Sequence, residues 1–177
     1  MGQNMHMKAT MSEEAFLGLM LSSIEVYKRE CLGLLLGYRM KEGFVIEYAI
    51  PYQAAERGHG VVDVLNKYHR RLQTALAALQ KWDLIGDFHS HPQYRNAKGN
   101  VSPSKEDIRD IQKNSIFIIV AINDRKKRQH FEMNKDGTIS GVLGEHHIKI
   151  ACFCKEKENS IHPVHLTCQF ATGLYAD

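Results

Sequence analysis

The sequence predicts an α/β or α+β fold in which helices pack against a mixed β-sheet. Segments with apolar residues at helical spacing alternate with short apolar runs that are typical of buried strands. The chain has 177 residues, of which 44% are hydrophobic and 24% charged. This length and composition predict one globular domain over residues 10–177, after a flexible leader at residues 1–9.

Three helices are expected in the first two thirds of the chain. Thr10 and Glu13 fit a capping box, which predicts a helix over 10–29 with an apolar stripe on one face. A second amphipathic pattern predicts a helix over 62–81. The third is expected over 104–114, because the serine at its start can serve as an N-cap.

Short apolar runs predict the strands of the sheet. The run at 115–122 is the clearest because it is rich in β-branched residues. We expect 128–133 to be its hairpin partner, and the sequence at 134–137 is typical of a turn. The other expected strands are 31–38, 44–50, 84–88, 139–143 and 148–153.

Charge and composition exclude several classes of function. The net charge of +3 is too small to indicate a nucleic-acid-binding protein. No apolar run is long enough to span a membrane, and the start of the sequence lacks a signal-peptide core. Four cysteines in a chain of this size do not form a disulfide framework, so we expect a cytoplasmic protein.

A candidate metal site lies at the end of the expected strand 84–88. His89 and His91 are two residues apart, so in a strand their side chains project from the same face. Asp107 lies at the start of the third expected helix and can add a carboxylate oxygen. Two imidazoles and one carboxylate form a three-ligand zinc set that leaves one position for water, which is the catalytic pattern.

These residues resemble the JAMM motif of MPN-domain (MPN+) zinc metalloproteases. That motif consists of a glutamate, then His-x-His, then Ser-x-x-Asp. Here His89–Pro92 and Ser104–Asp107 match its second and third parts. Glu30 matches the first, because it precedes a glycine-bounded apolar run at 31–37. The resemblance extends to about Ile122 and implies an MPN/JAMM-like mixed sheet flanked by helices, with a cytidine-deaminase-like architecture.

The resemblance also implies a role for each motif residue. His89, His91 and Asp107 would bind one catalytic Zn²⁺. Glu30 would be the general acid/base, since a carboxylate that does not bind the metal must carry the proton of the water. Ser104 would stabilise the oxyanion with its hydroxyl, although the same hydroxyl can instead cap the helix, and the sequence does not separate these roles.

The chain departs from the family pattern in the segment between its second histidine and its serine. Residues 92–103 intervene there, which is longer than the usual spacing, so we place an insertion within 94–100. The polar composition of residues 93–103 predicts an exposed loop beside the metal that affects substrate access.

The leading functional prediction is a zinc metallopeptidase that hydrolyses amide or isopeptide bonds. The resemblance implies a protein or peptide substrate, with ubiquitin-like and sulfur-carrier proteins as the known classes, and a prokaryotic-type single-domain member. The alternative is a non-catalytic MPN scaffold that binds partners. A zinc nucleoside deaminase would need His-x-Glu and Pro-Cys-x-x-Cys, and the sequence contains neither.

Two further groups of residues remain open. Asp87 alternates onto the same face as the two histidines and is either a partner of a metal ligand or a solvated side chain. Five residues near the C-terminus have side chains that can bind zinc, but their spacing fits no common zinc finger and the Cys-x-Cys pair can simply face the core. These five residues are Cys152, Cys154, His162, His165 and Cys168.

Overall fold

The computed structural model describes residues 7–53, 55–57, 62–64, 66–125, 127–157 and 160–174. In chain order the elements are β1 (Lys8–Met11), α1 (Glu13–Glu25), β2 (Leu32–Met40), β3 (Gly43–Pro51), β4 (Ala55–Arg57), β5 (Val62–Val64), α2 (Asn66–Leu79), β6 (Asp83–Pro92), α3 (Lys105–Asp110), β7 (Ile116–Asp124), β8 (Glu132–Met133), β9 (Ile139–Leu143), β10 (His146–Lys157), β11 (Ser160–Thr167) and α4 (Gln169–Thr172).

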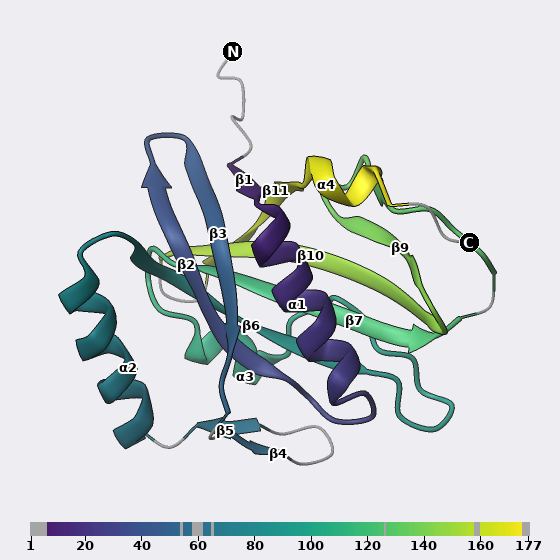
Figure 1. Ribbon diagram of the computed structural model, residues 1–177, viewed down its shortest axis with the longest axis horizontal. Helices are drawn as coiled ribbons and strands as arrows, with labels where there is room; N and C mark the ends of the chain where they lie inside the picture. Colours follow the sequence, from purple (N-terminus) through teal and green to yellow (C-terminus); the bar gives the residue numbers. More distant parts are fainter. Residues whose placement is uncertain are drawn as a thin grey trace.

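The main sheet is mixed and closes on itself (Figure 1). Its strand order is β11-β1-β3-β2-β6-β7-β10-β9-β8, and β10 also pairs with β11. Two strands pair with the same edge of β10, one after the other: β9 pairs with residues 146–150 and β11 with residues 152–157. Strand β6 runs parallel to β7 and antiparallel to β2. The expected mixed sheet is therefore confirmed, whereas the likeness to cytidine deaminases stays a prediction.

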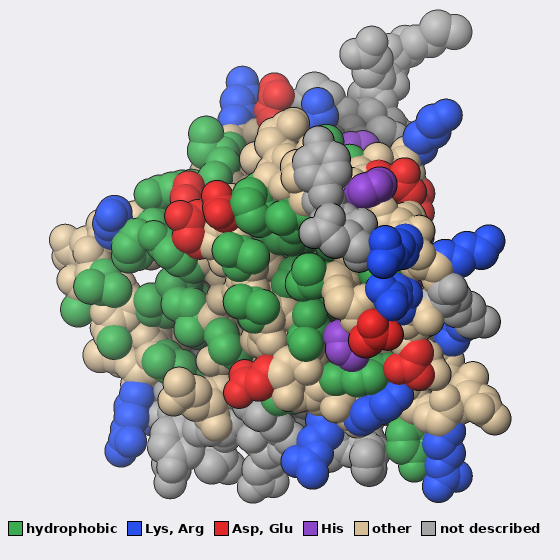
Figure 2. All heavy atoms as spheres, turned by 45° about the vertical axis from the view of Figure 1, so that its right-hand side comes forward, with side chains coloured by type: hydrophobic (Ala, Val, Ile, Leu, Met, Phe, Trp, Pro, Cys, Tyr) green, Lys and Arg blue, Asp and Glu red, His purple; other side chains and the backbone are tan. Residues whose placement is uncertain are grey.

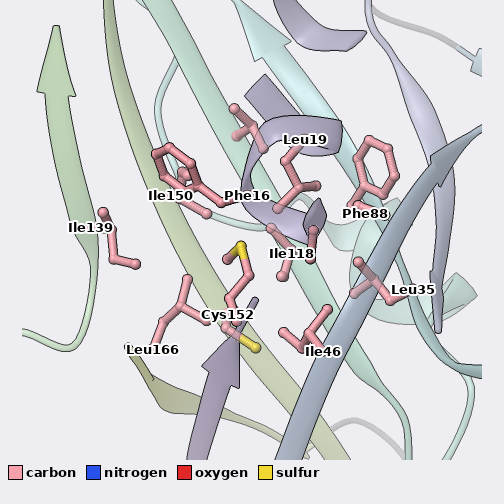
Figure 3. Packing of buried hydrophobic residues seen from close by; sticks show 14 of the residues in the cluster. Phe16, Leu19, Leu35, Ile46, Phe88, Ile118, Ile139, Ile150, Cys152 and Leu166 are labelled. Atoms are coloured by element: carbon pink, nitrogen blue, oxygen red, sulfur yellow. The ribbon is translucent and has the colours of Figure 1, made fainter. Parts of the chain in front are cut away.

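Helix α1 packs against the inner face of this curved sheet and forms the main core. Phe16 and Leu19 of α1 have no exposed surface and lie among side chains from several strands, including Leu35, Ile118 and Ile150 (Figure 3). Burial of each such side chain contributes about 1.5–3 kcal/mol, so this contact fixes the helix on the sheet. None of the described helices is long and apolar enough to cross a membrane.

Strand β7 is buried on both faces, which explains its continuous apolar sequence. Ile116, Ile118 and Val120 belong to the main core on the α1 side. Phe117 and Ile119 face the opposite way and form a small second core that includes Ile111, which directly follows α3. The outer face of β7 therefore supports α3 and the end of β6, where the candidate site lies.

The N-terminal part of the prediction needs two corrections. Residues 1–6 lie outside the described residues, but Lys8 and Ala9 belong to strand β1, which pairs with β3 and β11, so they are not part of a loose leader. The cap of α1 is Ser12 rather than Thr10, because the Ser12 side chain accepts a hydrogen bond from the N–H of Ala15 at 3.1 Å. The helix ends at Glu25, before the expected residue 29.

The predicted hairpin between 115–122 and 128–133 is wrong. Strand β7 pairs with β6 and β10, and the short β8 pairs with β9 around the predicted 134–137 turn. Strand β10 begins at His146, two residues before the expected strand 148–153, and the turn that precedes it lies at Gly144 and Glu145. The C-terminal stretch, for which the sequence predicts no element, forms β11 and α4.

The second predicted helix is shorter and less buried than its pattern suggests. Residues 62–64 form strand β5, and α2 begins at Asn66. The side chains of Leu72 and Leu79 are exposed, so this part of the apolar stripe of α2 does not lie in the core. Figure 1 shows α2 at one side of the sheet, and Figure 2 shows one broad area of hydrophobic side chains with many of the Lys and Arg side chains at its border.

Candidate metal centre

Strand β6 places His89 and His91 on the outer face of the sheet. The alternating residues Phe88 and Ser90 point to the inner side and have no exposed surface. The ring of His89 packs against Phe117 of β7, with ring centroids 4.9 Å apart. This contact and the parallel pairing of β6 with β7 hold both imidazoles in place at the carboxyl end of the strand.

The two imidazoles and Asp107 converge on one point. The Nε2 atoms of His89 and His91 are 2.7 Å apart. The Asp107 carboxylate lies 3.5 Å from Nε2 of His89 and 3.8 Å from Nε2 of His91. The three side chains are only 10%, 19% and 17% exposed. Three donor atoms this close, in partly desolvated side chains, match the histidine and carboxylate ligands that hold a metal ion.

A capping box at the start of α3 orients Asp107. The Ser104 hydroxyl oxygen accepts a hydrogen bond from the N–H of Asp107 at 3.1 Å, and the Asp107 carboxylate accepts one from the N–H of Ser104 at 2.6 Å. Ser104 therefore does cap the helix. No described residue uses its hydroxyl proton, which stays available to a ligand.

The long loop after His91 selects the tautomer of that imidazole. Nδ1 of His91 lies 2.8 Å from the carbonyl oxygen of Asn100. Because a carbonyl only accepts hydrogen bonds, Nδ1 carries the proton and the lone pair of Nε2 faces Asp107. The loop is fixed there by Asn123, whose side-chain amide donates to the carbonyl of Gly99 at 3.1 Å. A side chain at Gly99 would collide with the carbonyl oxygen of His91.

His89 is held in the neutral form that can bind a metal. Burial and, to a smaller extent, the neighbouring His91 lower the pKa of His89 to about 4, and Asp107 partly opposes this shift. Near neutral pH the imidazole therefore has a free lone pair, so no proton competes with a cation at this nitrogen.

Glu30 faces the same site from the connection between α1 and β2. Burial and, to a smaller extent, the charge of Asp107 raise the pKa of its carboxyl to about 7. Glu30 and His91 line one pocket of about 380 Å³, together with residues of the 92–100 loop. A carboxyl with a pKa near neutrality can both accept and donate a proton, as a general acid/base must.

Sequence reasoning did not identify the residues that support this site. Ser90 accepts a hydrogen bond from the N–H of Cys31, next to Glu30, at 2.8 Å. Asn123 holds the loop through its hydrogen bond to Gly99, and the loop in turn places the Asn100 carbonyl against His91. Ser90 could have been suspected, since it is a polar residue that alternates into the core. A backbone carbonyl leaves no trace in the sequence.

The other candidate residues do not join the site. Asp87 is half-buried and its charge contributes to the raised pKa of Tyr52, while it lines a small separate hollow beside Leu84 and Gln112. Within the described ranges, the only group of three or more possible ligands is His89, His91 and Asp107. The five C-terminal candidates form no such group, and the three cysteines among them are buried and unpaired.

Comparison with known proteins places the chain in a family. Residues 12–134 match the model of prokaryotic homologues of the JAB domain. The chain therefore belongs to this family, which includes metallopeptidases and non-catalytic members. No curated protein matches the chain.

A solved structure shows the same fold over almost the whole chain. It is the solution structure of protein DSY2949 from Desulfitobacterium hafniense, with a TM-score of 0.60 and 18% identity. The alignment covers 91% of this chain and 92% of that protein. At this level of identity the likeness concerns the fold alone.

Proposed function

We propose that this protein is a zinc-dependent metallopeptidase that hydrolyses amide or isopeptide bonds in a protein or peptide substrate. The observation that carries the proposal is the position of Glu30, whose carboxyl has a pKa of about 7, beside the His89, His91 and Asp107 group. A site that only binds a metal does not need a carboxyl that can accept and donate a proton, whereas a site that hydrolyses an amide bond does.

The donor set fits a catalytic rather than a structural ion. His89, His91 and Asp107 would hold it through two nitrogens and one oxygen, which leaves a position for water. A zinc ion held there supplies a Lewis acid that lowers the pKa of water to about 7.

The chain's own residues perform the proton transfers. Glu30 accepts a proton from the attacking water and donates it to the leaving amine, which its pKa permits in both directions. The Ser104 hydroxyl, whose oxygen accepts a hydrogen bond from the N–H of Asp107, donates a hydrogen bond to the developing oxyanion. The substrate classes proposed are ubiquitin-like and sulfur-carrier proteins, because these are the classes that the JAMM resemblance implies.

The alternative function is a non-catalytic MPN scaffold. Such a scaffold requires neither a partly buried Glu30 nor a complete set of three metal ligands. The presence of both therefore favours the enzyme over the scaffold.

The two functions are separated by Glu30→Gln, because this change keeps the size of the side chain and removes its basic carboxylate. In a hydrolysis assay on isopeptide-linked ubiquitin-like substrates, we expect the wild type to be active and Glu30→Gln to retain zinc but lose turnover. Glu106→Gln, at an exposed carboxylate in α3, is the matched control and should keep activity. Equal turnover by Glu30→Gln and wild type would refute the proposed role of Glu30.

A further inference from the structure

A second pocket adjoins the candidate metal centre. It has a volume of about 510 Å³ and shares the segment Lys98–Asn100 with the pocket that contains Glu30 and His91. Its remaining wall comes from Val101 and Ser102, the end of β7, Lys127 and Gln129 in the connection after β7, and the first residues of β10. A polypeptide bound at Glu30 could therefore continue into this second pocket across the 98–100 segment.

The lining of this pocket carries a surplus of positive charge. Three lysines line it, namely Lys98, Lys127 and Lys149. Lys149 forms an ion pair at 3.0 Å with Asp136, and Asp136 is not one of the residues that line the pocket. Lys98 and Lys127 are exposed and have no ion pair with any described residue. Two ammonium groups therefore remain available to an anion.

The one carboxylate in the lining is already engaged. The Asp124 carboxylate accepts a hydrogen bond from the hydroxyl of Tyr27 at 2.6 Å and another from the side-chain amide of Gln93 at 3.1 Å. Lys28 lies 3.6 Å from the same carboxylate. Asp124 therefore holds the connection before β2 against the end of β7, and it does not neutralise Lys98 and Lys127.

The pocket wall also contains an unsatisfied hydrogen-bond acceptor. Asn123 is 8% exposed, and its amide nitrogen donates to Gly99, which fixes the orientation of the amide group. Its Oδ1 atom has no hydrogen-bond partner among the described residues. This atom has almost no exposed surface, so its cost of about 1–3 kcal/mol belongs to the protein itself and it is not a contact for a ligand. A polypeptide is favoured over a phosphate ion because the shared 98–100 segment connects this pocket to the one that contains Glu30.

We infer that the pocket lined by Lys98, Lys127 and Asn123 binds an acidic segment, rich in Asp or Glu, of a polypeptide substrate. That this polypeptide is cut at the adjacent centre rests on the proposed function, whereas the binding itself does not. Free phosphate also carries anionic oxygens that could bind these lysines, so it is the competing ligand that the experiment must distinguish.

Binding of short blocked peptides to the full-length protein tests this inference. We expect an acetylated, amidated tetraglutamate peptide to shift the NMR signals of Lys98, Asn123 and His147, and to bind more weakly as salt rises. Its tetraglutamine counterpart should not bind. Lys98→Gln and Lys127→Gln should each weaken tetraglutamate binding about threefold, and the double variant about tenfold. Lys41→Gln, in the β2–β3 turn, removes the same charge elsewhere and should bind like wild type.

Three results would overturn the inference. These are equal binding by the double variant and wild type, equal binding of tetraglutamine, and a pocket that responds to inorganic phosphate but not to tetraglutamate. His89→Ala separates this inference from the proposed function, since it should lose the metal and hydrolysis yet still bind tetraglutamate. If wild type hydrolyses no substrate but binds as described, the pocket stands and the peptidase proposal fails.

Discussion

The N–H of Cys31 donates a hydrogen bond to the hydroxyl oxygen of Ser90 at 2.8 Å, and the N–H of Ser90 donates one to the carbonyl oxygen of Cys31 at 2.8 Å. Ser90 lies between His89 and His91, and Cys31 directly follows Glu30. This reciprocal pair therefore fixes the candidate acid/base relative to the candidate ligands. It joins two segments that lie 59 residues apart in the sequence.

Replacing Ser90 with alanine should separate positioning from metal binding. The change leaves the buried N–H of Cys31 without its acceptor, so the free energy of unfolding should fall by about 1–3 kcal/mol. Zinc should be retained, while turnover should fall by up to about 100-fold because Glu30 is displaced. Urea unfolding, metal analysis and peptidase assays measure the three effects.

Ser22→Ala is the control for Ser90→Ala, since Ser22 is a buried serine of α1 far from the ligands in the sequence. It should leave turnover unchanged. Loss of zinc in Ser90→Ala, or full turnover with a normal Michaelis constant, would contradict the positioning role.

Glu30 should make the stability of the metal-free protein depend on pH. Its pKa is about 7 in the folded protein, above the ordinary 4.5 of a glutamate, so the folded state binds the proton more tightly. Between these two values stability falls as pH rises, and the penalty is complete above about pH 7. Glu30→Gln removes this penalty. The melting temperature of Glu30→Gln minus that of wild type should therefore be larger at pH 8 than at pH 5, and a constant difference would contradict the raised pKa.

Two substitutions of Ser104 separate its role as a cap from its role toward the substrate. Ser104→Ala should cost about 1 kcal/mol of stability and Ser104→Gly only a few tenths, since glycine is a better N-cap than alanine. If the hydroxyl stabilises the oxyanion, both variants should lose about 100-fold in turnover number. Recovery of activity in Ser104→Gly would show that capping is its only role. Ser160→Ala, at a serine of β11 outside both pockets, should behave like wild type.

The loop contact of Asn123 should influence metal affinity. Asn123→Ala removes the hydrogen bond to Gly99 and so loosens the Asn100 carbonyl that fixes the His91 tautomer. Loss of such indirect support typically costs 10–100-fold in metal affinity, and we expect about tenfold. Zinc competition titrations measure this change. Asn134→Ala, at an asparagine that bonds Thr138 and Ser140 instead, should leave affinity unchanged, and equal affinities for all three proteins would contradict the role of the loop.

The sequence predicted those parts of the fold that depend on local patterns. Strands 44–50, 115–122 and 139–143 were predicted because their apolar patterns have no competing interpretation. The pairing of β7 was mispredicted, because β-strand partners are set by contacts far apart in the sequence. The exposed leucines of α2 have the same explanation. An amphipathic pattern predicts a helix but does not determine whether its apolar face packs against another element.

The candidate site could be predicted where the side chains themselves do the chemistry. Alternation along a strand was enough to place His89 and His91 on one face. The capping position of Ser104 was also predictable, but the carbonyl of Asn100 was not, because every residue has one. That carbonyl belongs to the 93–103 loop, whose length makes the spacing of the motif unusual.

The most direct test of this account is the zinc content of the purified protein, measured by atomic emission beside that of His89→Ala and Asp107→Asn. We expect one zinc per chain in the wild type and a large loss in both variants, because each removes one of three ligands. A wild-type protein without bound zinc, or a His89→Ala variant that keeps a full equivalent, would contradict it.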